Sequence, residues 1–312
     1  MDHLDSLRVF IAVADTGGFA KAARRLGLSA PAATRAIGAL EQRLSARLLL
    51  RTTRSLRLTD AGERFLADCR RIVMDLEDAE AAAGGVHAQP RGTLAITAPS
   101  MFGRLHMAPL VLDFLAQHPQ VGARTLFVDR LVHLLEEGID VALRIARLPD
   151  SGLSAVPVGA TRVMTVATPA YLAQHGTPLL PADLLQHQGI GFAQDGAQRP
   201  PWSFYPPGRK TAAARELATP PMRLVANTSE LSIAAALRGQ GFVRALAYQL
   251  AEPLQTGALR AVLTDWEPVP VPVHLVTLAG RHGPAKQRAF VDFAVERLRA
   301  LPVLAGAAFL AA

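Results

Sequence analysis

The sequence has only one cysteine and no long hydrophobic run, and we expect no N-terminal targeting signal. A lone Cys69 cannot form an internal disulfide, which fits a reducing compartment. No stretch offers about 18 uninterrupted apolar residues, so we expect no membrane-spanning helix. The first residues include Asp2, Asp5 and Arg8, unlike a signal peptide. We therefore expect a soluble, cytoplasmic protein with no membrane partner.

The sequence also lacks the motifs that carry catalysis or hold cofactors. It contains no HExxH, no phosphate-binding P-loop, no GxGxxG after a strand and no CxxC. The nine histidines are scattered without metal-ligand spacing, and the segment TSELS, residues 228–232, lacks the flanking glycines of a hydrolase nucleophile. We expect no enzymatic activity, no metal site and no cofactor.

What the sequence does have is basic charge concentrated at the N-terminus. Residues 1–57 hold ten basic and four acidic side chains, whereas residues 58–86 hold three basic and seven acidic ones. A chain of 312 residues is long enough for two or three domains. The charge pattern is typical of a phosphate-binding module joined to a larger domain.

The N-terminal segment predicts a helix-turn-helix. Apolar residues from Leu4 to Ala14 have helical spacing, a second helix is expected over 19–26, and a third begins after the N-cap Ser29. Gly27 suits a left-handed position between the last two helices. In the third helix one face is predicted to be buried, comprising Ala33, Ile37, Leu40 and Leu44. The opposite face carries Pro31, Thr34 and Arg35, which the arrangement directs toward the major groove of DNA.

Two short strands, Leu48–Arg51 and Leu56–Leu58, are predicted to form a hairpin that carries Arg51, Arg54 and Arg57. A basic hairpin beside a helix-turn-helix is a wing, whose arginines can reach phosphates or a narrow minor groove. The alternative is a solvated strand edge that discourages pairing with other strands.

A long helix is expected over residues 59–85, with Thr59 as its cap. Its apolar positions follow heptad spacing, which is typical of a coiled-coil seam between two chains. The alternative is an amphipathic helix folded against its own domain. The predicted seam comprises Phe65, Cys69, Ile72, Leu76 and Ala79.

Beyond a Gly- and Pro-containing hinge at 86–92, strands and helices alternate as in an α/β domain over residues 93–302. A short helix is expected to end near Glu137. The order of elements predicts two lobes, one from about 93–162 and 266–302 and the other from about 163–265. Two open α/β lobes place a ligand in the crevice between them.

The phrase from Leu7 to Gly62, beginning LRVFIAVADTGGFAKAARRLGLS, closely resembles the DNA-binding domain of LysR-type transcriptional regulators. The resemblance implies a winged helix-turn-helix, a linker helix that pairs subunits, and a homodimer or homotetramer on promoter DNA. The DNA contacts that it favours are Ser29, Pro31, Thr34, Arg35, Arg51 and Arg54. This sequence departs from the family pattern at Ala30, Ser45-Ala46 and Leu50.

The remainder is similar to the family's effector-binding domain, which is built like a type 2 periplasmic binding protein. The phrases GTLAITAPSMFGRLHMAPLVLDFLAQHP and EEGIDVALRIARLPDSGLSAVPVG carry that likeness. It implies a small-molecule effector, with an organic acid as the expected class, and contact with RNA polymerase if the protein is an activator. The candidate effector residues are Ser100, Met101, Phe102, Arg144, Arg147, Phe192, Thr228 and Ser229.

Some of these effector candidates can instead have purely structural roles. Ser100 can be a helix cap and nothing more, and either Arg144 or Arg147 can form surface or inter-lobe salt bridges. A different class of protein also stays open, namely a small-molecule binding protein or enzyme whose N-terminal helices serve only for assembly.

Overall fold

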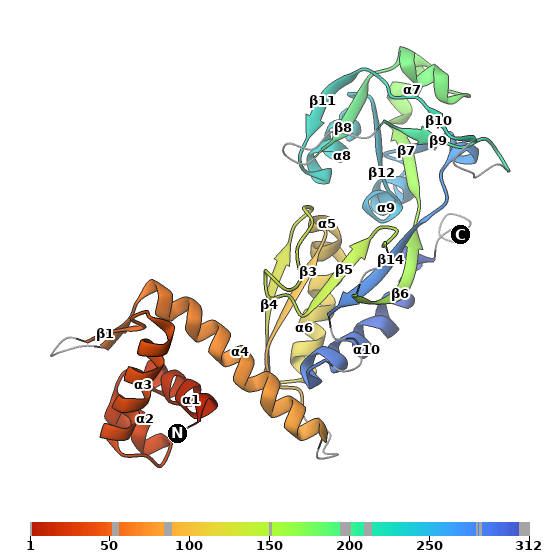
Figure 1. The fold of residues 1–312 in the computed structure, drawn as a ribbon. Coiled ribbons are helices and arrows are strands. Elements are labelled where there is room, and N and C mark those ends of the chain that lie inside the picture. The colour runs from red at the N-terminus through yellow and green to blue at the C-terminus, as the bar shows by residue number, and fades with distance from the viewer. Residues whose placement is uncertain are drawn as a thin grey trace. The chain divides into compact units, whose positions relative to one another are not determined.

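The computed structural model describes residues 2–51, 56–83, 89–149, 152–193, 201–208, 214–278, 280 and 283–305. The chain forms two compact units, unit 1 of residues 1–89 and unit 2 of residues 90–312 (Figure 1). Each unit has its own apolar core. Over the described ranges, no helix is both long and apolar enough to cross a bilayer.

Unit 1 consists of three helices, a hairpin and a long helix, as the sequence predicts. The elements are α1 His3–Thr16, α2 Phe19–Arg25, α3 Ala30–Leu44, β1 Leu49–Arg51, β2 Leu56–Leu58 and α4 Asp60–Ala83. The two strands pair antiparallel. The tip of the hairpin, residues 52–55, and part of the expected hinge, residues 84–88, lie outside the described residues.

Local chemistry explains where these helices begin and end. Gly17 and Gly27 adopt left-handed φ angles of 68° and 67°, which suit glycine at the ends of α1 and α2. The Ser29 hydroxyl accepts a hydrogen bond from the Ala32 amide at 3.3 Å and so caps α3. Ser45 ends α3 at a φ of 51°, although it has a side chain.

The core of unit 1 contains the predicted stripe of α3 except for its last member. Ala33, Ile37 and Leu40 are buried, but Leu44 is 38% exposed, so its prediction as a core residue is wrong. The reason is that α3 ends at Leu44 and the left-handed Ser45 turns the chain, after which Leu48 and Leu49 fill the core.

Unit 2 is built on two five-stranded mixed sheets (Figure 1). The first sheet has the order β4-β3-β5-β14-β6, with β3 Gly92–Ala98, β4 Val121–Phe127, β5 Val141–Ile145, β6 Ser154–Thr161 and β14 Val271–Thr277. The second has the order β11-β8-β12-β7-β13, with β7 Val163–Ala167, β8 Gly189–Phe192, β11 Met222–Ala226, β12 Phe242–Leu246 and β13 Arg260–Val262. The chain crosses between the sheets from β6 to β7 and returns from β13 to β14, which makes two lobes.

Helices follow the strands in both lobes. They are α5 Ser100–Phe102, which continues through a π-helical turn Gly103–Met107 into α6 Ala108–Gln117, then α7 Pro169–His175, α8 Ser229–Leu237, α9 Ala247–Gln255 and α10 Ala285–Arg299. Short 3-10 turns span Pro181–Gln186, Thr264–Trp266 and Pro302–Leu304. A small ribbon pairs β9 Ser203–Phe204 with β10 Glu216–Leu217.

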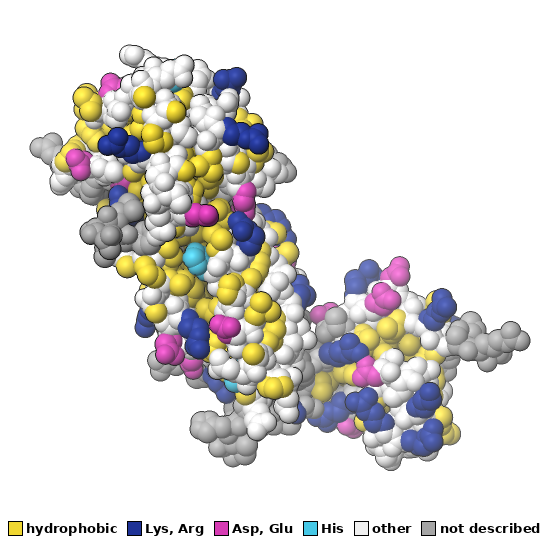
Figure 2. All heavy atoms as spheres, turned by 180° about the vertical axis from the view of Figure 1, so that it is seen from behind, with side chains coloured by type: hydrophobic (Ala, Val, Ile, Leu, Met, Phe, Trp, Pro, Cys, Tyr) yellow, Lys and Arg dark blue, Asp and Glu magenta, His cyan; other side chains and the backbone are white. Residues whose placement is uncertain are grey.

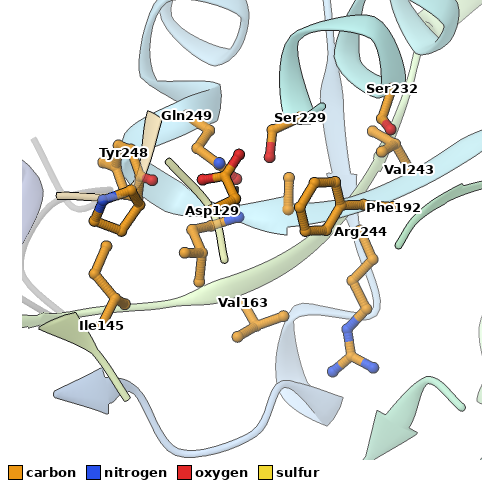
Figure 3. Close-up of a pocket in the computed structure, with 13 residues that line it drawn as sticks. Asp129, Ile145, Val163, Phe192, Ser229, Ser232, Val243, Arg244, Tyr248 and Gln249 are labelled. Carbon is orange, nitrogen blue, oxygen red and sulfur yellow. Dashed lines mark hydrogen bonds between the residues drawn. The ribbon is translucent and has the colours of Figure 1, made fainter. Parts of the chain in front are cut away.

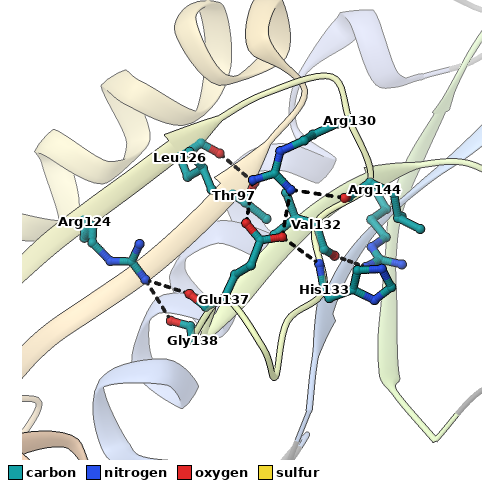
Figure 4. A network of polar contacts seen from close by, with 10 residues as sticks. Thr97, Arg124, Leu126, Arg130, Val132, His133, Glu137, Gly138 and Arg144 are labelled. Carbon is teal, nitrogen blue, oxygen red and sulfur yellow. Dashed lines mark hydrogen bonds and ion pairs between the residues drawn. The ribbon is translucent and has the colours of Figure 1, made fainter. Parts of the chain in front are cut away.

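In place of the short helix expected before Glu137, residues 134–138 form a hydrogen-bonded turn, and side chains of the same segment bind Glu137 (Figure 4). Arg130 donates to both carboxylate oxygens of Glu137, at 2.8 and 2.6 Å, and the His133 amide donates to the same carboxylate at 3.1 Å. The Arg130 hydrogen bond lowers the pKa of Glu137 to about 2. This carboxylate therefore stays ionised at neutral pH, where it can accept the hydrogen bonds from Arg130 and the His133 amide.

Candidate functional site

The outward face of α3 is open to solvent. Ser29, Pro31 and Arg35 are exposed and Thr34 is partly exposed, while the opposite face of the same helix is buried. Figure 2 shows more Lys and Arg than Asp and Glu side chains on the visible face of unit 1. A helix with one buried face and one open, polar face next to basic charge has the shape and sign to enter a DNA groove.

The hairpin is fixed to the end of α3 by Glu41. Its Oε1 accepts hydrogen bonds from the amides of Leu48 at 2.8 Å and Leu49 at 3.1 Å, so the carboxylate holds the backbone as it enters β1. Arg51 ends β1 opposite Leu56, and its backbone position is on the hairpin next to the undescribed tip. Arg54 lies outside the described residues.

The first half of α4 packs inside unit 1. Phe65 lies against Phe10 with ring centroids 5.8 Å apart, and Cys69 is fully buried. These two positions of the predicted seam are therefore occupied within the chain, as in the alternative of a helix folded against its own domain. Ile72 is 45% exposed and Leu76 is partly exposed, whereas for Ala79 the structure describes the position in α4 and not the side chain.

A cleft of about 230 Å³ lies between the two lobes of unit 2 (Figure 3). Pro99 and Asp129 reach it from the carboxyl ends of β3 and β4, and Phe192 reaches it from the end of β8. Ligands of open α/β sheets bind at such strand ends. The complete lining is Pro99, Asp129, Ile145, Val163, Phe192, Ser229, Ser232, Val243, Arg244, Ala245, Leu246, Tyr248 and Gln249.

Two of the eight predicted effector residues, Phe192 and Ser229, line this cleft, and six do not. Thr228 caps α8 by accepting from the Leu231 amide at 3.3 Å. Arg144 donates to the Val132 carbonyl at 2.9 Å, and Arg147 is exposed away from the cleft lining.

The other three predicted residues pack next to residues of the cleft wall without lining the cleft. The Ser100 hydroxyl donates to the Phe127 carbonyl at 3.3 Å, and Phe102 is fully buried against Tyr248 with ring centroids 5.1 Å apart. Met101 packs against the cores of both lobes. Ser100, Met101 and Phe102 therefore shape the wall without lining it.

Sequence analysis missed five polar members of the lining, namely Asp129, Ser232, Arg244, Tyr248 and Gln249. A signal existed for Asp129, because it follows β4 closely and the carboxyl ends of parallel strands meet at one edge. No comparable pattern marked Tyr248 or Gln249, which reach the cleft from the start of α9.

Burial governs the titration of the larger polar groups. It lowers the pKa of Arg244 to about 10, against the opposing effect of the Glu267 and Tyr205 charges, so Arg244 stays cationic at neutral pH. Burial, followed by the negative charge of Asp129, raises the pKa of Tyr248 above its usual value, so its phenol stays neutral. Across the described residues, no group of three or more His, Cys, Asp or Glu side chains is placed to hold a metal ion.

Comparisons with known proteins agree on one family. Residues 4–63 match the model of the bacterial regulatory helix-turn-helix protein, lysR family, and residues 87–299 match the LysR substrate binding domain. The chain is 35% identical over 302 residues to an HTH-type transcriptional regulator of Xanthomonas campestris, covering 96% of this chain and 86% of that one.

Two solved full-length structures resemble the whole chain. CrgA, a LysR-type transcriptional regulator of Neisseria meningitidis, is 29% identical with a TM-score of 0.59, over 94% of this chain and 98% of that one. The Vibrio cholerae virulence activator AphB is 28% identical with a TM-score of 0.58, over 95% and 99%. With an open helix-turn-helix face in unit 1 and a two-lobed effector domain in unit 2, the chain belongs to the LysR family of transcriptional regulators.

Proposed function

We propose that the outward face of α3 reads promoter DNA in the major groove. The observation that carries this proposal is the division of α3 into a buried face and an exposed face that presents Pro31 and Arg35, with Thr34 partly exposed. Arg35 is the base-reading candidate, because its forked donors match the acceptors of guanine. Ser29 caps the helix at its DNA-facing start, while Arg51 and Arg54 of the wing contact phosphates.

The second half of α4 pairs two chains. Ile72 is exposed although its neighbour Val73 is buried in the unit 1 core, Leu76 is partly exposed, and Ala79 follows them in the heptad. Pairing places two copies of α3 about one DNA turn apart, so that a homodimer, or a homotetramer of two dimers, matches a partly palindromic site.

The cleft of unit 2 binds a small effector, which shifts the arrangement of the subunits on DNA. A ligand does this only through unequal affinity for the two arrangements. If the protein activates transcription, RNA polymerase is the partner that the bound arrangement contacts. Regulation in this scheme requires no chemical step, so we propose no enzymatic activity for the protein.

Footprinting at several salt concentrations tests the DNA contacts. Arg35→Ala is expected to weaken binding to the specific site by about 1–3 kcal/mol and to leave binding to random DNA nearly unchanged. Arg54→Ala is expected to weaken binding to all sequences and to reduce the salt slope by about one. Arg223→Ala, which removes an exposed charge from β11 of unit 2, is the matched control. Equal losses on specific and random DNA for Arg35→Ala would remove Arg35 from base reading.

A further inference from the structure

The start of the helix at Ser100 is already occupied by a negative group of the protein itself. The Ser100 amide donates to Oδ1 of Asp129 at 2.9 Å, and the Ser100 hydroxyl is directed to the Phe127 carbonyl. An organic acid bound at this place would need free donors at the helix start. Because Asp129 takes that position and also lines the cleft, an effector meets a carboxylate there instead of the expected donors.

The other charged residue of the cleft lining does not offset Asp129. Arg244 donates to the Ser203 carbonyl at 2.5 Å, and its guanidinium lies over the Phe204 ring at 4.6 Å. In Figure 3 this guanidinium points away from Asp129. The Asp129 end of the cleft is therefore negative, and a carboxylate placed there would meet a like charge at short range.

The rest of the cleft near Asp129 offers an apolar surface with few polar groups. Ile145, Val163 and Phe192 line it from both lobes, and Ser229 and Gln249 add a hydroxyl and an amide near the carboxylate (Figure 3). A carboxylate has about four acceptor positions, and the bond from Ser100 uses one. The site is thus suited to a donor group on an apolar body.

We propose that the effector of this protein carries a protonated amine that binds Asp129, while its apolar part lies against Phe192 and Val163. The proposal rests on the cleft being the effector site, as set out under the proposed function. It replaces the organic acid with a cationic, hydrogen-bond-donating ligand class.

The test compares two probes that share one apolar body, phenethylamine and phenylacetate, on the full-length protein. Binding is measured by calorimetry and by the rise in melting temperature at millimolar probe concentrations. Phenethylamine is expected to bind and to raise the melting temperature, and phenylacetate is expected to do neither. Asp129→Asn keeps an acceptor for the Ser100 amide but removes the charge, so amine affinity is expected to fall about tenfold or more.

Asp113→Asn is the control, because Asp113 is exposed on α6 and does not line the cleft. It is expected to leave amine binding unchanged. The proposal is overturned if phenylacetate binds as well as phenethylamine, if neither amine binding nor a melting shift is seen, or if Asp129→Asn keeps full amine affinity. A gel shift on promoter DNA without any probe is scored separately, so failure of the amine arm is distinct from failure of DNA binding.

Discussion

At the scale of single residues, Gly62 shows how closely the hairpin and the linker helix approach. A Cβ at Gly62 would lie 2.1 Å from the Leu48 carbonyl oxygen, which is backbone and cannot rotate away. The same carbonyl accepts the Thr59 amide at 3.0 Å, and the Thr59 hydroxyl accepts the Gly62 amide at 2.9 Å. Glycine is therefore required where α4 starts beside the entry to the wing.

Replacing Gly62 with alanine is expected to destabilise unit 1 by about 1–3 kcal/mol, because the new methyl group forces the backbone apart. Gly38→Ala is a matched control, for which the expected change in stability has the opposite sign. Gly38 is exposed within α3 and a Cβ there meets nothing within 4 Å, so alanine is expected to stabilise by about 0.5–1 kcal/mol. Urea denaturation of residues 1–89, followed by circular dichroism, measures both. A neutral Gly62→Ala would contradict the close approach.

Cys69 is expected to be inert in the folded protein. Burial, followed by the charge of Asp68, raises the pKa of its thiol from 9.0 to about 11, so at pH 8 the thiolate fraction falls about 100-fold below that of the unfolded chain. Alkylation with iodoacetamide, followed by mass spectrometry, should be at least 100-fold slower in buffer than in urea. Equal labelling rates in buffer and urea would show that Cys69 is accessible.

The raised pKa of Cys69 also predicts a contribution to the free energy of unfolding that is fully present below pH 9 and is lost as the pH rises through about 11.

At the scale of elements, the position of the wing depends on Glu41. One carboxylate oxygen accepts both amides at the start of β1, and neither Leu48 nor Leu49 has an exposed side chain. Glu41→Ala leaves these two amides without their acceptor and is expected to cost about 1–3 kcal/mol of unit 1 stability. It is also expected to weaken DNA binding, because the wing is no longer held.

Glu41→Gln separates the hydrogen bonds from the charge. Its amide oxygen can accept the same two bonds, so most of the stability and of the DNA affinity should return. Thermal melting and a gel shift on one promoter fragment measure the two effects. If the glutamine variant is as unstable as the alanine variant, the charge and not the hydrogen bonds holds the wing.

The elements that sequence predicts well are those defined by neighbouring residues. The Ser29 cap, the left-handed Gly27 and the buried Ile37 all follow from spacing within one helix and its turn. The predictions of a buried Leu44 and of a helix before Glu137 were wrong, because the left-handed Ser45 and the Arg130–Glu137 ion pair decide those places and apolar spacing reveals neither. The cleft shows the same limit, since Arg244 depends on Ser203 and Asp129 on Ser100, partners that spacing along the chain does not reveal.

At the scale of the whole molecule, the proposed DNA-binding features and the proposed effector site lie in different units. Unit 1 holds the basic block of the sequence, while unit 2 holds both sheets and the cleft. The core of unit 1 contains Phe10, Ile37 and Cys69, and the largest core of unit 2 contains Leu94, Phe114 and Phe290. Each unit can therefore be tested for its own activity.

Residues 90–312, produced without unit 1, are expected to keep the phenethylamine response and to lose DNA retention. The physical reason is that the acceptor Asp129 and its apolar surroundings belong to unit 2, whereas the α3 face and the wing belong to unit 1. Full-length protein should retain promoter DNA with an affinity that falls steeply between low and physiological salt, as counterion release requires. Gel shifts measure DNA retention by both proteins, and melting curves measure their response to phenethylamine. Retention of promoter DNA by residues 90–312 would contradict the assignment of DNA binding to unit 1. Weak, sequence-independent retention by the full-length protein would favour the alternative in which the N-terminal helices serve only for assembly.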